Sequence, residues 1–309
     1  MKEMITETRM LYLYVESPLH AGVGSGLSSI DLPIQRERTT QYPMIQGSGI
    51  KGKLRAAIEG DRNKLPVDEQ VKVDMLFGPS AEEGKGNEHA GALILGDARI
   101  LLFPVRSLNG VFAYTTSYYA LNRFRRDIER STGNGKLPWN VPNSVEGKAL
   151  VTTTCKVQAN DVMVLEEFSF DIQKEQEVDK IAKWIAENAL PANLGSYWSD
   201  KIKSSLVILT DDDFRDFALY ATEIITRVRL DRDKKTVVNG ALWTEEHLPS
   251  DTLLYVPVYA TNARKNGRSE SAVDILRIAK ELGTKEGNYL QLGGDETVGR
   301  GVVQVQWWQ

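Results

Sequence analysis

The feature that most constrains the fold of this chain is a repeated change between strand-like and helix-like spacing of apolar residues. Residues 10–15, MLYLYV, have the alternation of an opening strand and lead into a loop rich in glycine and serine. The next segment, GSGIKGKLRAAIEG, changes to a helical spacing in which Ile50, Leu54 and Ile58 share a face, with Ser48 as the expected cap. This order is typical of mixed α and β proteins.

The rest of the chain continues in the same mixed manner. Residues 91–105 and 111–117 are expected strands around an Asn-Gly turn, and residues 271–282 form an amphipathic helix pattern. The C-terminal segment has the pattern strand, glycine loop, strand. No repeat period and no low-complexity linker interrupts the sequence. We therefore predict one α+β domain with insertions across residues 1–309.

Composition excludes several classes of protein. With 309 residues, 41% hydrophobic and 26% charged, the chain can bury a sizeable core and is not a disordered or fibrous type. It has no run of about 18 apolar residues and no signal-peptide pattern, so we expect a cytoplasmic protein without a membrane partner. The single cysteine, Cys155 in VTTTCKV, permits no internal disulfide and is expected to be a buried thiol on a strand. Structural zinc is not expected, because three histidines and one cysteine would need carboxylates to complete a site.

The distribution of charge indicates a local anion site. A net charge of −4 argues against a protein that coats nucleic acid over its whole surface, but basic residues concentrate in IKGKLR and NRFRRDIER. GSGIKGK fits the first seven positions of a phosphate-binding loop, although Leu54 stands where a serine or threonine should reach magnesium. The helix start can therefore bind a phosphate without hydrolysing a nucleotide, and the alternative is that its glycines serve only a tight turn before a surface helix. The residues expected there are Ser48, Gly49, Lys51, Lys53 and Arg55.

Asp31 is the acid that stands out in the N-terminal loop. It lies in SIDLPIQRER, between the glycine and serine stretch and the basic residues Arg36 and Arg38. An acid in such a loop is ordinarily only solvated, but the arginines beside it would attract an anion. A second glycine loop, GGDETVGRG at residues 293–301, has the same ambiguity between a tight turn and a phosphate site.

Taken in order, these segments resemble the RAMP family of CRISPR proteins. The features that carry the resemblance are the N-terminal strand, the IQGSGIKGKLR loop and helix, and the C-terminal glycine loop before a final strand. GSGLSSIDLPIQRE, LFGP, LLFPVRS, LVILTDDDF, TEEHLP and TVGRG narrow it to the backbone subunits of type III-B Cmr effector complexes. The resemblance covers nearly the whole chain.

The resemblance implies a ferredoxin-like, RRM-like palm with an inserted helical region and a β-hairpin thumb. It also implies guide RNA, target RNA, other Cmr subunits and stacked copies of the chain itself as partners. On this analogy the thumb lies within about residues 226–258, and its Leu242 and Trp243 are candidates to wedge against bases. Arg36, Gly299 and Arg300 join the residues expected to bind RNA.

The resemblance further implies that Asp31 is the residue needed to cut target RNA. A carboxylate with an ordinary pKa near 3.9 is a weak base at neutral pH, so we expect Asp31 to hold Mg²⁺ or another divalent cation. His20 in SPLHAG and Glu246 in TEEHLP match further acid-base candidates, with Glu245 an equally plausible register. Two alternatives stay open. In the first, the chain serves only as an RNA scaffold. In the second, His20 and His247 act together as the acid-base pair of a metal-free ribonuclease.

Overall fold

The computed structural model describes residues 7–26, 29–79, 89–131, 136–285 and 287–307. Within these ranges the strands are β1 (Glu7–Val15), β2 (Met44–Ile45), β3 (Leu93–Leu95), β4 (Ala98–Arg106), β5 (Phe112–Ser117), β6 (Lys148–Val151), β7 (Val162–Leu165), β8 (Phe168–Lys174), β9 (Leu206–Leu209), β10 (Glu223–Leu230), β11 (Val237–His247), β12 (Leu253–Ala260), β13 (Tyr289–Gln291) and β14 (Val302–Gln306). The helices there are α1 (Gly47–Glu59), α2 (Val67–Phe77), α3 (Tyr118–Ser131), α4 (Gln176–Asn188), α5 (Ser196–Ser205), α6 (Asp211–Tyr220) and α7 (Ala272–Gly283).

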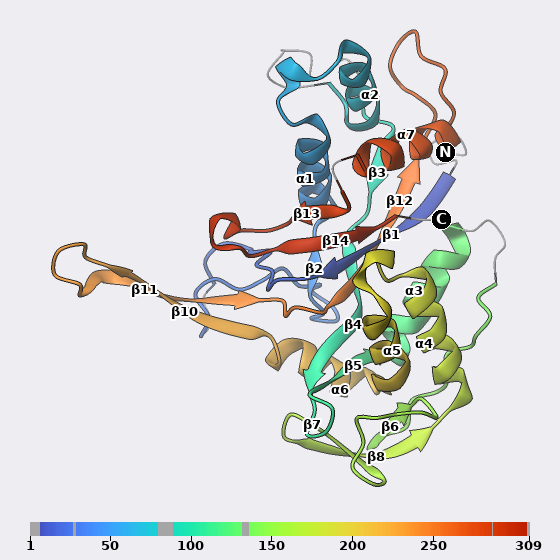
Figure 1. The fold of residues 1–309 in the computed structure, drawn as a ribbon, viewed down its shortest axis with the longest axis vertical. Helices are drawn as coiled ribbons and strands as arrows, with labels where there is room; N and C mark the ends of the chain where they lie inside the picture. The colour runs from blue at the N-terminus through green and yellow to red at the C-terminus, as the bar shows by residue number, and fades with distance from the viewer. Residues whose placement is uncertain (1–6, 27–28, 80–88, 132–135, 286, 308–309) are drawn as a thin grey trace.

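One large sheet runs through the molecule (Figure 1). Its strand order is β13-β14-β1-β12-β4-β5-β9-β6-β8-β7, with β2 paired to β4 and β3 paired to β12. Most neighbours are antiparallel, but β5 with β9 and β6 with β8 are parallel. The predicted α+β class is confirmed. No helix of the described ranges is long and apolar enough to cross a bilayer.

Strand β1 is buried on both faces because helices cover both sides of the sheet. Leu11 and Leu13 belong to the core that includes α1, α2 and α7, whereas Tyr12 and Tyr14 pack into a second core with α3, α4 and α5. Successive side chains of a strand point to opposite faces, so two helical layers make both positions apolar. This explains why residues 10–15 contain tyrosine where a half-exposed strand would carry charge.

Two local expectations are wrong. Ser48 does not cap α1, which begins one residue earlier, and the N–H of Gly47 donates instead to Asp97 Oδ1 at 2.8 Å. Cys155 is not on a strand, because β6 ends at Val151 and the chain then turns. The thiol is nevertheless buried, as predicted.

The helix expected at residues 271–282 is confirmed as α7. Ser271 caps it, with its hydroxyl accepting from the N–H of Asp274 and the Asp274 carboxylate accepting from the N–H of Ser271. Helices α4 and α5 between residues 176 and 205 were not predicted. They cover the part of the sheet formed by β5, β6 and β9.

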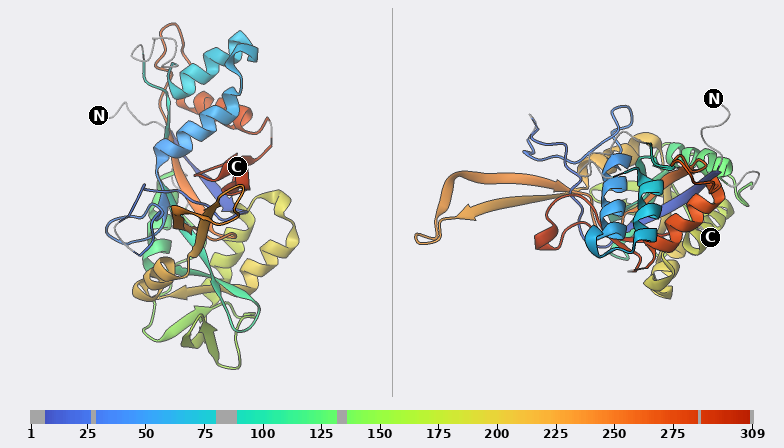
Figure 2. Two further views of the ribbon diagram at one scale, coloured as in Figure 1. Left: turned by 90° about the vertical axis from the view of Figure 1, so that its left-hand side faces the viewer. Right: turned by 90° about the horizontal axis from the view of Figure 1, so that it is seen from above.

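Strands β10 and β11 form a separate two-stranded hairpin that projects from the body (Figure 2). We call Glu223–His247 the thumb. The interval expected for it, 226–258, overlaps this hairpin, but its last part is β12 in the middle of the main sheet. Apolar side chains are exposed along the projecting part, namely Ile224, Val228, Leu230, Val237 and Leu242.

Candidate functional site

The base of the thumb is hydrogen-bonded to the loop that carries Asp31. Leu32 forms a parallel bridge with Glu245, and its N–H donates to the carbonyl oxygen of Thr244 at 3.0 Å. The N–H of Glu246 donates in turn to the carbonyl oxygen of Leu32 at 3.0 Å. Part of a loop that looks flexible in the sequence is therefore fixed like a short edge strand against β11.

Asp31 is exposed, and Thr244 orients its carboxylate. The Oδ2 atom accepts from the backbone N–H of Thr244 at 2.8 Å and from its hydroxyl at 2.9 Å. These hydrogen bonds, the backbone one first, lower the pKa of Asp31. Asp31 is therefore ionised at neutral pH, a poor general base but a suitable anionic ligand for a hard cation.

His20 lies next to the same stretch of β11. Its Nδ1 is 2.7 Å from the carbonyl oxygen of Glu246, which can only accept, so Nδ1 carries the proton. The ring of His247 lies beside it, with 5.4 Å between ring centroids. His247 is fully buried, and burial, followed by the charges of His20 and Arg300, lowers its pKa. Because His247 is shielded from solvent, this geometry does not favour a paired-histidine ribonuclease.

Glu246 is a buried residue with its carboxylate oxygens occupied. Oε1 accepts from Arg36 Nη2 at 2.5 Å and from the hydroxyl of Thr222 at 2.9 Å, and Oε2 accepts from the N–H of Ile34 at 3.0 Å. The guanidinium of Arg36 also donates to the carbonyl oxygens of Gln41 and Ala218. This ion pair holds the Asp31 loop on the thumb base, and the geometry favours that structural role over proton transfer by Glu246 or RNA contact by Arg36.

Glu245 points to the opposite face of β11, where it meets a different set of partners. Arg227 Nε donates to its Oε2 at 2.9 Å, and Trp243 Nε1 donates to its Oε1 at 2.7 Å. Burial alone raises the pKa of Glu245, but the hydrogen bonds from Trp243 and Arg227 outweigh it and lower the pKa. Arg227 also contacts Asp295 of the C-terminal glycine loop at 3.2 Å. Of the two candidate carboxylates, Glu245 is therefore the one on the side of the C-terminal glycine loop.

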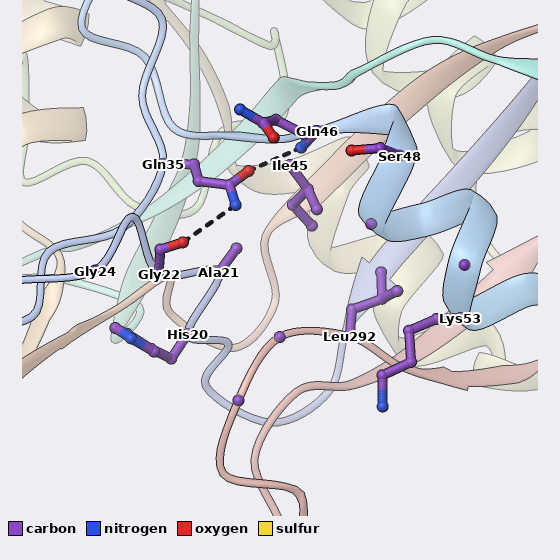
Figure 3. A pocket seen from close by; sticks show the side chains of 14 residues that line it. His20, Ala21, Gly22, Gly24, Gln35, Ile45, Gln46, Ser48, Lys53 and Leu292 are labelled. Atoms are coloured by element: carbon purple, nitrogen blue, oxygen red, sulfur yellow. Dashed lines mark hydrogen bonds between the residues drawn. The ribbon is translucent and has the colours of Figure 1, made fainter. Parts of the chain in front are cut away.

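A cavity of about 630 Å³ opens between His20, the start of α1 and the C-terminal glycine loop (Figure 3). Ser48, Gly49 and Lys53 of α1 line one wall, as the sequence predicts for a phosphate site, and Gly293 lines another. The Nζ of Lys53 donates to Gln291 Oε1 at 2.7 Å. Residues more than 240 positions apart thus line one hollow next to His20.

Glycine is required where this loop closes on the N-terminal segment. A Cβ on Gly293 would lie 2.3 Å from the carbonyl oxygen of His20, and a Cβ on Gly301 would lie 1.9 Å from that of Leu292. Both residues also have positive φ, +79° and +72°. The glycines therefore bring the loop into backbone contact with His20, and the N–H of Gly294 donates to the His20 carbonyl at 2.9 Å.

Other residues expected to bind RNA lie outside the cavity. Arg55 faces α2, where it donates to Glu59 Oε2 at 2.8 Å and to the carbonyl oxygen of Gly78 at 3.0 Å. Lys51 is partly buried, and this burial, then the charge of Arg55, lowers its pKa. The structure thus separates Lys53, which lines the cavity, from Arg55, which joins two helices.

Gly299 and Arg300, which were also expected to bind RNA, lie in the second glycine loop. Gly299 has φ +74° and ends the short 3-10 helix Glu296–Val298. Arg300 follows it, with its backbone N–H on the carbonyl oxygen of Asp295 at 3.2 Å. Burial raises the pKa of Glu223, and the positive charge of Arg300 opposes that rise; the same charge adds to the effect of burial in lowering the pKa of His247. Arg300 therefore adds positive potential at the thumb base.

The two wedge candidates on the thumb differ in exposure. Leu242 is 62% exposed, whereas Trp243 is half-buried with its indole N–H on Glu245. Leu242 therefore has the freer surface for a base, and Trp243 packs at the base of the hairpin. The structure also identifies a residue that sequence reasoning missed: Thr244, which orients Asp31, carries no signal beyond its place in a strand pattern.

The donor set at Asp31 fits a cation only in part. Mg²⁺ commonly takes one or two protein carboxylates and completes its shell with water and substrate phosphates. Asp31 offers one exposed carboxylate, so it fits a cation whose other ligands are water and RNA phosphates. Among the described residues, the group of three side chains with metal-ligand proximity is a different one, Glu245, His247 and Asp295.

Fold and site together define a protein of the RAMP class. The model of the RAMP superfamily matches residues 12–304, and the chain belongs to this superfamily.

Among its relatives, the CRISPR system Cmr endoribonuclease Cmr4 of Pyrococcus furiosus is 40% identical over 293 residues, which cover 95% of this chain and 93% of that protein. The crystal structure of oligomeric Cmr4 from Pyrococcus furiosus is 33% identical and matches with a TM-score of 0.72 over 98% of each chain. A chain of the type III-B Cmr-beta complex bound to cognate target RNA has the same fold, with a TM-score of 0.73 over 98% of each chain and 21% identity.

Proposed function

We propose that this chain is the backbone subunit of a type III-B CRISPR effector complex, where it binds guide RNA and cuts complementary target RNA. The observation that carries the proposal is an exposed, ionised Asp31 held by Thr244 where the thumb leaves the body. The relative named as a Cmr endoribonuclease, at 40% identity, supports the assignment of activity. The partners proposed are guide RNA, target RNA, other Cmr subunits and further copies of this chain, in the cytoplasm.

The finer fold proposed is a ferredoxin-like, RRM-like palm. Its four strands would be β1, β3 with β4, β12 and β14, and its two helices α1 and α7. In support, the sheet has the order β14-β1-β12-β4, and the chain runs β1, α1, β4, then β12, α7, β14. The segments from β5 to α6 and the thumb are insertions between the second and third palm strands.

The reaction we propose is in-line attack of an RNA 2′-hydroxyl on the adjacent phosphate. Asp31 would hold a divalent cation, Mg²⁺ in the simplest case, which when bound stabilises negative charge on the phosphate and the leaving oxygen. His20 has its Nδ1 fixed on Glu246, which leaves Nε2 to accept or donate a proton. Glu245 is the alternative to Glu246 for a second carboxylate, and its partners place it at the glycine loop.

The path proposed for guide RNA follows the cavity. Ser48, Gly49 and Lys53 would contact phosphate groups on one side, and the loop with Gly299 and Arg300 on the other. The N-terminus of α1 contributes less than a bare helix end, because Asp97 already accepts from Gly47. Positive side chains and backbone N–H groups therefore carry this interaction together.

The test is cleavage by the assembled complex with Asp31→Asn. This change keeps the hydrogen-bonding shape but removes the charge, so cleavage of complementary RNA should slow by about a hundredfold or more while RNA affinity stays near wild type. The matched control is Asp161→Asn, an exposed aspartate in the turn before β7. Wild-type cleavage by Asp31→Asn would refute the assignment and favour a scaffold.

Chelation separates the remaining alternatives. A metal-dependent site stops cutting in EDTA and recovers with Mg²⁺, whereas a histidine pair continues to cut. Persistent cleavage in EDTA, lost in His20→Asn, would favour the metal-free reaction.

A further inference from the structure

A second polar cluster lies on the face of β11 away from Asp31. It consists of Glu245, His247 and Asp295, whose ligand atoms all lie within 4.8 Å of one another. Two of these residues come from the thumb base and the third from the C-terminal glycine loop. Elements far apart in the chain thus place three metal-binding side chains together.

His247 gives the independent reason to regard this cluster as a site. Its side chain is fully buried, and neither ring nitrogen has a hydrogen-bond partner within the part of the chain that the structure describes. A buried polar group without a partner costs free energy, so such a group calls for a ligand that satisfies it. The ring is aimed at the two carboxylates, with Nε2 at 3.6 Å from Asp295 Oδ2 and 3.9 Å from Glu245 Oε2.

These separations are too long for hydrogen bonds but suit ligands around one ion. In a tetrahedral site with bonds of about 2.0–2.2 Å, adjacent ligand atoms lie about 3.4 Å apart. The two distances from the imidazole therefore approach those of a metal site and exceed the usual limit of a nitrogen–oxygen hydrogen bond. A small closure of the Asp295 loop would complete the geometry.

We propose that Glu245, His247 and Asp295 bind a divalent transition-metal ion such as Zn²⁺, which joins the thumb base to the C-terminal glycine loop. One imidazole and two carboxylates suit Zn²⁺ better than Mg²⁺, because imidazole is a borderline-soft ligand and Mg²⁺ prefers oxygen alone. Three protein ligands leave the fourth position for water. The site is distinct from the exposed carboxylate of Asp31. It shares Glu245 with the alternative second carboxylate of the proposed cleavage reaction, but metal binding here can be measured without RNA or cleavage.

Arg227 is the competing cation at this site. Its guanidinium contacts Glu245 Oε2 and Asp295 Oδ2, the same oxygens that face His247. Its side chain is 25% exposed on the projecting strand β10, so it can leave the cluster toward solvent. Metal binding and the Arg227 ion pairs are therefore alternatives, and removal of the arginine side chain should strengthen metal binding.

The experiment is calorimetric titration of the metal-free full chain with Zn²⁺, in a His89→Ala background that removes the one histidine outside the site region. One equivalent should bind and raise the melting temperature. His247→Gln and Asp295→Asn should each weaken affinity at least about tenfold, since even loss of a residue that only orients a ligand costs about that much. Asp161→Asn, at an exposed aspartate in the turn before β7, is the matched control and should bind Zn²⁺ as the parent does.

The variant Arg227→Met distinguishes a metal site from a cluster that is only structural, because only a metal site would bind Zn²⁺ more tightly without the arginine. Loss of a charged hydrogen-bonding competitor should tighten Zn²⁺ binding by about tenfold. Absent binding to the parent, unchanged affinity in Asp295→Asn, or weaker binding in Arg227→Met would each overturn the proposal. If His247→Gln does not fold, Asp295→Asn still decides, because its side chain lies partly exposed on a loop.

Discussion

At the scale of single residues, Thr244 controls the direction in which Asp31 points. We predict that Thr244→Val slows target cleavage by about fivefold to tenfold, because it removes one hydrogen bond to a charged carboxylate and keeps the backbone N–H bond. RNA affinity should not change. Single-turnover cleavage rates measure the effect, with Thr226→Val as control, since Thr226 is the cross-strand neighbour on β10. An equal loss in the control would contradict the positioning role.

Asp251 offers a pH-dependent prediction away from the RNA site. Burial raises its pKa, although Tyr14 donates to its Oδ1 at 2.5 Å. The folded protein therefore holds this proton up to a higher pH than the unfolded chain does, and stability falls as the pH rises through the window above the ordinary value of 3.8.

We predict that Asp251→Asn stabilises the protein at pH 7 and that the gain disappears as the pH falls toward 4. Asparagine can still accept from Tyr14 and tolerates the φ of +69° at this position. Denaturant unfolding at several pH values measures the difference from wild type. A gain that is independent of pH would show that the charge of Asp251 is not its cause.

Sequence reasoning found several functional candidates but not the geometry that distinguishes them. Asp31 and His20 were singled out, and the structure places both beside β11. Glu245 and Glu246 could not be separated, because a shift of one residue reverses every side chain of a strand. The choice depends on partners such as Arg36, which lies about 210 positions before Glu246 and cannot be assigned from local pattern.

At the scale of elements, α1 allows a direct test of the RNA path. We predict that Lys51→Glu with Lys53→Glu weakens guide-RNA binding and reduces the salt slope of log K by up to about 1.4, for two single-strand phosphate contacts. Lys53 lines the cavity and Lys51 lies on the same helix. Lys72→Glu with Lys64→Glu is the control of equal charge change outside the cavity. A slope identical to wild type would place the RNA elsewhere.

The thumb can be shortened without changing the strands of the main sheet. Residues 229–241 can be replaced by Asn-Gly, which joins the paired residues Val228 and Leu242 through a two-residue turn. We predict a free energy of unfolding within about 0.5 kcal/mol of wild type but altered spacing or efficiency of target cuts, since the removed part belongs to the projecting two-stranded hairpin and not to the main sheet. A cleavage ladder equal to wild type would contradict a role in displacing bases.

Elements with strong local patterns were predictable, and those defined by tertiary packing were not. Helix α7 carries a capping box and one apolar face, and it was predicted within one residue. Strand β6 contributes only Lys148–Val151, and its parallel pairing with β8 leaves no hairpin signal in the sequence. The Asp31 loop was expected to be flexible because its partner, β11, is distant in the chain.

At the scale of the whole molecule, the exposed apolar side chains of the thumb suit contact with a neighbouring copy or with RNA bases. We predict that the chain loads onto single-stranded RNA in whole copies, with a fixed number of nucleotides for each copy added. Analytical ultracentrifugation with RNAs of increasing length measures this. One copy per RNA at every length would argue against a stack. In the variant with the shortened thumb, the number of nucleotides for each copy added should no longer be fixed.

The overall α+β class followed from the sequence. An inserted helical region was expected from the family resemblance, but its extent and its packing were not. Residues 118–220 hold α3 to α6 and much of the second core, in which Phe124, Trp139 and Trp184 pack together. Aromatic residues separated by loops give no periodic signal until the packing is known. Replacing Phe124 by alanine would open a cavity and lower the free energy of unfolding by about 3–5 kcal/mol. This helical layer therefore contributes to the stability of the sheet.

The thumb also behaves as a lever arm. Eight residues of β10 at about 3.3 Å each make an arm of roughly 26 Å, so a tilt of about 10° at the base moves the tip by about 4–5 Å. That displacement exceeds the rise of one nucleotide, about 3.4 Å. The accuracy with which the tip meets a given nucleotide is therefore decided at the other end, by the few ion pairs that Arg36 and Arg227 make there.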